Sequence, residues 1–157
     1  MSDFPAYIAQ GHDQSRVEEY AVSTTTNENL LVGDLAVWDA GNDWIERAGA
    51  DPTAIMGISE VRSADARTLT PNNKIPLREL TAGVVVAMSS ATAYVEGTHR
   101  NVEYGITRSS AGNWRVDVSK TGGSARVRVV RGEVSQDQNI WYVQFLAEYL
   151  ATDGIDS

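Results

Sequence analysis

The stretch VEYGITRSSAGNWRVDVS, which runs from Val102 to Ser119, decides the fold class. Apolar and polar residues alternate in both halves, and the segment RSSAGN between them has the composition of a turn. Successive side chains of a strand point to opposite faces, so a period of two predicts two half-buried strands. We therefore expect a β-hairpin whose aromatic and β-branched side chains face one another across the strands. The apolar positions are Val102, Tyr104 and Ile106, then Trp114, Val116 and Val118.

The same period continues toward the C-terminus. In the segment SARVRVVRGEV, valines alternate with Arg126 and Arg128, which predicts another strand. The segment WYVQFL (141–146) alternates as well, but from Phe145 to Leu150 the apolar residues take a helical spacing. We expect a strand there that is followed by a short helical turn.

Further strands precede the hairpin. The run GVVVAM (83–88) is continuously apolar and mostly β-branched, which is typical of a strand buried on both faces. Upstream, the segments LLVGDLAVWD (30–39), WIERAG (44–49) and AIMGISEVR (54–62) predict three short strands. The turn sequences DAGND and ADP separate them.

These elements predict an all-β protein, a compact β-barrel or β-sandwich with an extended N-terminal arm. A length of 157 residues fits one domain. Over residues 1–29 the apolar positions are scattered, and VSTTTNEN (22–29) has the chemistry of a loop. We therefore expect residues 1–29 to form an arm that a partner orders, or else a disordered terminus, and residues 30–157 to form the β domain.

Composition excludes several classes of site. The chain has no Cys, which removes disulfides, thiolate nucleophiles and cysteine-based zinc sites. No apolar run approaches the ~18–20 residues of a membrane span, and the polar start lacks the features of a signal peptide. We expect a protein that is made and used without export and that binds no membrane.

The sequence also lacks the motifs that are typical of catalytic and metal-binding sites. There is no Gly-rich phosphate loop and no GxSxG elbow, and His12 and His99 lie in polar segments that predict surface histidines. The turn DAGND lacks the ligand spacing of a calcium loop, and Glu18 and Glu19 would point to opposite faces of a strand. The sequence predicts no enzyme activity, no cofactor and no metal.

The charge is divided along the chain. The net charge of −8 is the sum of −9 over residues 1–61, +6 over residues 62–131 and −5 over residues 132–157. An acidic protein is a poor nucleic-acid binder, because phosphate contacts supply most of that affinity. The blocks either form complementary surfaces for docking and self-association or cancel locally in the fold.

Two pairs of residues are candidates for binding sites, and each pair also has a purely structural explanation. Trp38 and Trp44 flank an acid-rich turn and are candidates for a carbohydrate- or ligand-binding surface, whereas tryptophans in strands more often pack in a core. Arg126 and Arg128 lie on the polar side of a predicted strand. They are candidates to bind phosphate or a partner's carboxylate, or to protect a sheet edge.

The order of strands and turns from Val32 to Arg62 resembles the opening barrel segment of the decoration, or head cement, proteins of tailed bacteriophages. The resemblance rests on Gly33-Asp34, the turn DAGND, the segment WIERAG and the segment AIMGI. The segment LTAGVVVAMSSA (80–91) is similar to a second apolar strand of such modules, and ARVRVV and WYVQFL fit their closing strands. Tail-tube and head-completion subunits would show much the same pattern.

The resemblance implies a structural virion protein without catalytic residues. Such a protein binds the outside of a capsid lattice assembled in the host cytoplasm, commonly as a homotrimer, and stabilises the capsid by bridging neighbouring capsomers. Its partners would be the major capsid protein and copies of itself. The alternatives are a ligand-binding module that uses Trp38 and Trp44 and, third, a hydrolase that uses carboxylates, for which no pair is identified. The candidate partner-interface residues are Phe4, Tyr7, Ile8, Arg126 and Arg128.

Overall fold

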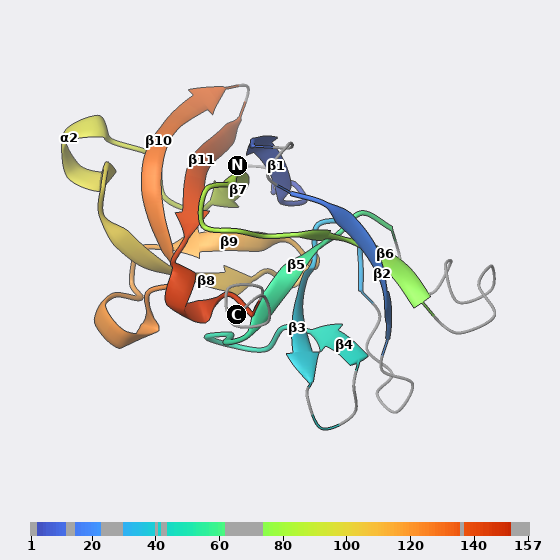
Figure 1. Cartoon of the computed structure of the whole chain (residues 1–157). Coiled ribbons are helices and arrows are strands. Elements are labelled where there is room, and N and C mark those ends of the chain that lie inside the picture. Colours follow the sequence, from blue (N-terminus) through green and yellow to red (C-terminus); the bar gives the residue numbers. More distant parts are fainter. Residues whose placement is uncertain are drawn as a thin grey trace.

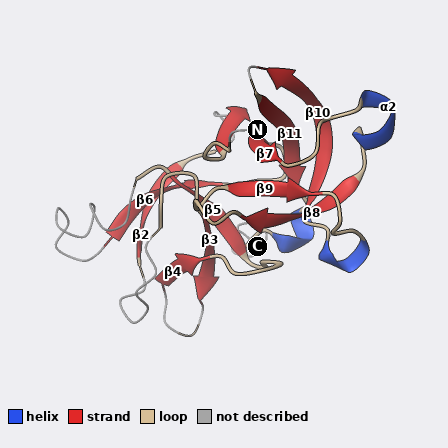
Figure 2. Cartoon of the chain, turned by 180° about the vertical axis from the view of Figure 1, so that it is seen from behind, coloured by secondary structure: helices blue, strands red, loops and turns tan. Residues whose placement is uncertain are grey.

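Strands dominate the structure, a computed structural model that describes residues 3–11, 15–22, 30–39, 41, 44–61, 74–135 and 137–151. They form two sheets that pack as a compact β-sandwich-like fold (Figure 1). The predicted all-β fold class is therefore confirmed. Figure 2 shows how small the helical share of the described chain is.

The first sheet has six strands, and part of it closes on itself. Strand β7 pairs with β11 along one edge, while β1 and β9 share its other edge. The pairing of β7 with β9 is parallel and joins the two ends of the series β7-β11-β10-β8-β9. The strands, in sheet order, are β1 (Tyr7–Gln10), β7 (Val85–Ser90), β11 (Gln138–Phe145), β10 (Val127–Ser135), β8 (Glu103–Arg108) and β9 (Trp114–Asp117).

The second sheet has five strands and also curls. Val22, directly after the first strand of this sheet, forms a parallel bridge with Ile45 in the last strand, which brings the two edges together. The strands, in sheet order, are β2 (Val17–Ala21), β6 (Lys74–Glu79), β5 (Ile55–Ser59), β3 (Leu35–Asp39) and β4 (Trp44–Arg47).

Strand β3 separates two hydrophobic cores. Leu35 and Val37 face the main core, which contains side chains of both sheets, whereas Ala36 and Trp38 face a smaller core inside the five-stranded sheet. This alternation is the predicted period of two with a hydrophobic environment on each side. The main core therefore holds the two sheets together.

The predicted hairpin is confirmed as β8 and β9, with Ile106 opposite Val116. Strand β7 is buried along its whole length, and β11 is followed by a single 3₁₀ turn, Ala147–Tyr149, as predicted. The described α-helix is the four-residue α2 (Glu96–His99). Within the described residues, no helix is long and apolar enough to cross a membrane.

The structure describes parts of residues 1–29, the segment that we expect to form an arm. In these parts, β1 pairs with β7 in the first sheet and β2 pairs with β6 in the second. The two strands have only four and five residues, too few for an alternation of apolar and polar residues to predict them. Residues 1–2, 12–14 and 23–29 of the expected arm lie outside the described residues.

Strand β6 was not predicted from the sequence. Its segment KIPLRE contains Pro76, which cannot donate a hydrogen bond to a neighbouring strand and so argues against an internal strand. The structure nevertheless places β6 between β2 and β5, with Pro76 opposite Glu19.

Candidate docking surface

Strand β1 divides its side chains between the core and the surface. Ile8 is opposite Val86 and lies in the main core with only 7% of its area exposed. Tyr7 is opposite Ala87 on the outer face and is 48% exposed. Because cross-strand partners share a face of the sheet, Tyr7 belongs to the outer surface and Ile8 does not. Of these two predicted interface residues, only Tyr7 is available to a partner.

An apolar cluster covers the outer face of β1, β7 and β11. Val85, Ala87 and Tyr142 form its buried base, and Phe4 packs against them from the segment that precedes β1. The rings of Phe4 and Tyr7 lie 6.0 Å apart in a tilted arrangement. The segment that enters β1 thus presents two aromatic side chains on a buried apolar base.

A groove of about 380 Å³ lies beside this cluster. It continues into a smaller hollow of about 130 Å³, and both share Tyr7 and Val32 on their walls. Val32 is 45% exposed, in the turn that precedes β3. We call this groove with its two exposed apolar side chains the Tyr7 surface. The groove is lined by Phe4, Pro5, Ala6, Tyr7, Val32, Gln138 and Ile140.

The border of the Tyr7 surface is polar. Arg131 lies over the ring of Tyr142 at 3.7 Å, and the Tyr142 hydroxyl donates a hydrogen bond of 2.8 Å to Glu133. Burial and the neighbouring Glu133 carboxylate raise the pKa of the Tyr142 phenol. An ion pair of 3.7 Å joins Asp3 to Arg115. An apolar centre with a polar rim is the usual anatomy of a protein–protein interface.

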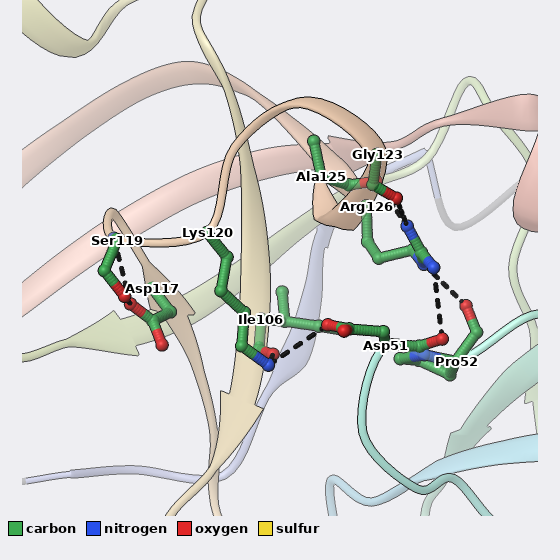
Figure 3. Close-up of polar contacts among 9 residues, drawn as sticks. All are labelled: Asp51, Pro52, Ile106, Asp117, Ser119, Lys120, Gly123, Ala125 and Arg126. Atoms are coloured by element: carbon green, nitrogen blue, oxygen red, sulfur yellow. Dashed lines mark hydrogen bonds and ion pairs between the residues drawn. The ribbon is translucent and has the colours of Figure 1, made fainter.

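Arg126 does not lie on an exposed polar face, where the sequence predicts it. Arg126 is only 5% exposed, and its guanidinium donates to the backbone carbonyls of Pro52, Asp51, Gly123 and Ala125 (Figure 3). It also stacks over the Tyr149 ring at 3.8 Å. This arginine is a structural clamp between two loops and is not available to bind a partner.

Arg128 is exposed and pairs with Glu103 on the adjacent strand β8. Its exposure allows Arg128 to contribute to a surface, but the Glu103 carboxylate already neutralises its charge. It does not lie among the residues that line the Tyr7 groove.

Trp38 and Trp44 do not form one binding surface. Trp38 is opposite Ile45, a fully buried residue of the smaller core, and its ring contacts Tyr20 edge-on at 6.4 Å. Trp44 is the immediate neighbour of Ile45 on β4 and so points to the opposite face of the strand pair. The register places the two indoles on different faces, which disfavours the predicted sugar-binding pair.

His99 is not the surface histidine that the sequence predicts. It is buried at the end of α2, where its Nδ1 accepts a hydrogen bond of 2.9 Å from the Val95 backbone and its ring lies 4.8 Å from that of Trp141. His12 lies outside the described residues. Among the residues that are described, no three His, Asp or Glu side chains are grouped to hold a metal ion.

The sequence analysis missed the most deeply buried charge, Asp34. Its carboxylate is fully buried and accepts hydrogen bonds of 2.8 and 2.9 Å from Arg108, 2.9 Å from the Trp114 indole and 2.9 Å from the Leu31 backbone. These contacts join the turn before β3 to strands β8 and β9. The sequence does contain a signal that could have identified this residue. Gly33 and Asp34 are adjacent within a run of apolar residues, a pattern typical of a turn that carries a buried charge.

No protein-family model matches this chain, and no curated protein matches it. The functional assignment therefore depends on the residues and the geometry described above.

Proposed function

We propose that this protein is a structural virion protein that binds the outside of a phage capsid lattice and stabilises it by bridging neighbouring capsomers. The observation that carries the proposal is the Tyr7 surface, an apolar groove with two half-exposed apolar side chains on a rigid two-sheet body. The strand-and-turn order from Val32 to Arg62, with its resemblance to head decoration proteins, supports it.

The groove fits a partner that presents apolar side chains. Aromatic residues at the centre of an interface provide large contact areas at a low cost in side-chain entropy, so a few of them supply most of the binding energy. If three copies act together, linkage to the lattice raises the effective concentration of each weak contact. A homotrimer on the major capsid protein is the arrangement that we propose.

Capsids that lack this protein provide the test. Adding the purified protein back should raise the melting temperature of the capsids, and the protein should co-sediment with them. Replacing Tyr7 by Ala should weaken co-sedimentation at least about tenfold, the cost typical of an interface hot spot. Val134→Ala is the matched control, because Val134 is 54% exposed on β10 and does not line the groove.

The melting temperature of the free protein shows whether a variant binds more weakly because docking is impaired or because the fold is destabilised. It should be nearly the same for the wild type and both variants, because exposed side chains contribute little to stability. The proposal is refuted if the wild-type protein neither binds the capsids nor raises their melting temperature. Equal loss of binding in Tyr7→Ala and Val134→Ala would instead show that docking uses another surface.

A further inference from the structure

Strand β10 is longer than the contact that covers it on the side of β8. Of its nine residues, Val127 and Arg128 pair with β8. The backbone of Val129 then makes hydrogen bonds of 2.8 and 3.0 Å with residues 101–102, just before β8. Beyond this point β11 is the one strand that pairs with β10 in the described part of the chain (Figure 1). This leaves an open sheet edge over residues 130–135, which we call the β10 edge.

The β10 edge is accessible from outside. Its exposed residues are Arg131, Glu133, Val134 and Ser135. Gly132 is half-buried, because the Tyr94 ring occupies the place where its side chain would be and so covers the face of the strand there. In an antiparallel strand, alternate residues direct their backbone N–H and C=O groups away from the neighbouring strand. An open edge of this kind is a template for a further strand.

Proteins usually protect such edges with charged side chains. Strand β2, at the end of the five-stranded sheet, carries exposed Glu18 and Glu19 side by side. Antiparallel pairing of two β2 strands about this centre would place glutamate opposite glutamate, which is destabilising. The β10 edge differs, because its two charges have opposite signs and lie on either side of Gly132.

This arrangement makes the β10 edge complementary to itself. If two copies pair antiparallel with Gly132 opposite Gly132, Arg131 of each copy lies opposite Glu133 of the other. Val130 then lies opposite Val134, an exposed apolar residue that gains a partner. Opposite charges and apolar side chains are favourable cross-strand pairs, and the two-fold symmetry makes each pair occur twice. The chemistry of the edge therefore identifies a second copy of this chain as its partner.

Tyr142 prepares the two charged side chains for this pairing. It lies opposite Arg131 on β11, with the guanidinium 3.7 Å above the centre of its ring. Its hydroxyl donates a hydrogen bond of 2.8 Å to Glu133. Both charges are thus held on the outer face of the sheet, on the same side as Tyr7. Side chains that are already ordered lose less entropy when a partner binds.

We propose that two copies of this protein pair through their β10 edges, antiparallel and centred on Gly132. The two-fold axis is then perpendicular to the sheet, so the six-stranded sheets of both copies join into one. Both Tyr7 surfaces face the same side of the joined sheet. On a capsid such a contact would connect copies that belong to neighbouring trimers. The pairing itself requires no capsid, so it is tested with the free protein and its failure leaves docking through the Tyr7 surface untouched.

The test is sedimentation equilibrium of the purified full chain at concentrations up to ~1 mM, where weak pairing is populated. Arg131→Glu and Glu133→Arg should each weaken association at least about tenfold, because each places like charges opposite one another in both pairs. An equal mixture of the two variants should associate about as the wild type does, because every pair between the two chains again joins opposite charges. This rescue is specific to the antiparallel register.

Arg128→Gln is the matched control and should associate as the wild type does, since Arg128 lies on the part of β10 that β8 covers. Melting temperatures of the separate variants show whether the fold is intact. Hydrogen exchange at the amides of residues 131–135 should slow as the wild type associates, which a contact through side chains alone would not produce. The proposal is overturned if the wild type does not associate, if these amides are unchanged, or if the mixture associates no better than either variant alone.

Discussion

Gly57 shows how a single missing side chain shapes the five-stranded sheet. A Cβ at this position would overlap the backbone carbonyl of Arg78 on the neighbouring strand β6. The close approach leaves room for hydrogen only, and it explains the glycine in the segment AIMGI. Gly33 is constrained in a second way, since its φ is +85° and a Cβ there would lie 2.7 Å from Pro5. Gly33 and Gly57 are thus both required by backbone geometry.

Replacing Gly57 by Ala should lower the free energy of unfolding by about 1–3 kcal/mol, because a backbone carbonyl cannot move away as a flexible side chain could. Urea denaturation measures the effect. Gly97→Ala is the control, since nothing lies within 4 Å of a Cβ there and Ala is favoured over Gly in a helix. A Gly57→Ala protein as stable as the control would contradict the predicted clash.

At the scale of elements, a buried carboxylate fixes β2 and its lead-in to β6. Glu79 is 4% exposed, accepts a hydrogen bond from the Tyr20 hydroxyl and pairs with Arg16 at 3.0 Å. Its backbone carbonyl accepts a further bond of 2.5 Å from the Ser15 hydroxyl. The side chains of β2 are mostly exposed, so polar contacts, and not a hydrophobic face, attach this strand to β6.

The alkaline stability of the protein should depend on Tyr20. Burial, the hydrogen bond to Glu79 and the Glu79 charge raise the pKa of the Tyr20 phenol well above its ordinary value of 10. Above about pH 10 the unfolded chain loses this proton while the folded chain keeps it, so stability is full below that pH and falls as the pH rises. Urea denaturation between pH 8 and pH 12 should show this decline.

Tyr20→Phe should be less stable at pH 8, by about 1–2 kcal/mol for the lost bond to a charged acceptor, and should show a shallower decline at high pH. Part of the decline should remain, because the pKa of Tyr142 is also raised by burial and by Glu133. Tyr7→Phe is the control, since Tyr7 is half exposed on the outer face. Identical slopes for Tyr20→Phe and the wild type would exclude the proposed linkage.

At the scale of the whole molecule, the two sheets share a hydrophobic core and a buried charge. The main core contains Leu35 and Ile55 from one sheet and Val86 and Ile106 from the other. The Asp34 carboxylate spans the same junction through Arg108. Shared apolar burial and a shared buried charge make partial unfolding of either sheet costly, because the other would be left with exposed apolar surface.

Calorimetry should therefore show one unfolding transition whose calorimetric and van't Hoff enthalpies agree. Asp34→Asn should lower the free energy of unfolding by about 3–5 kcal/mol, because the Arg108 guanidinium loses its buried partner. Asp137→Asn, in an exposed turn, should change it by no more than about 0.5 kcal/mol. Two separate transitions in the wild type, or equal stability of the two variants, would show that the sheets fold independently.

Neighbouring residues show where sequence reasoning stops. Arg126 and Arg128 have the same local pattern, yet one is buried and the other is exposed. The difference comes from the loop at Asp51 and Pro52, which is distant in the chain and reaches only Arg126. A period of two reports the face on which a side chain lies, but not what another segment places on that face.

The sequence by itself determined the strands whose alternation is strong, the hairpin from Val102 to Ser119 above all, because the period of side chains along a strand is a local property. Only the tertiary structure decided that β1 and β2 belong to two different sheets and that Trp38 and Trp44 lie on opposite faces of the strand pair β3–β4. It also decided that the Asp34 carboxylate is buried among hydrogen-bond donors. These outcomes depend on strand order and register, which are set by contacts between segments far apart in the chain. The Tyr7 surface arises in the same way, since its groove brings together side chains from three separate segments.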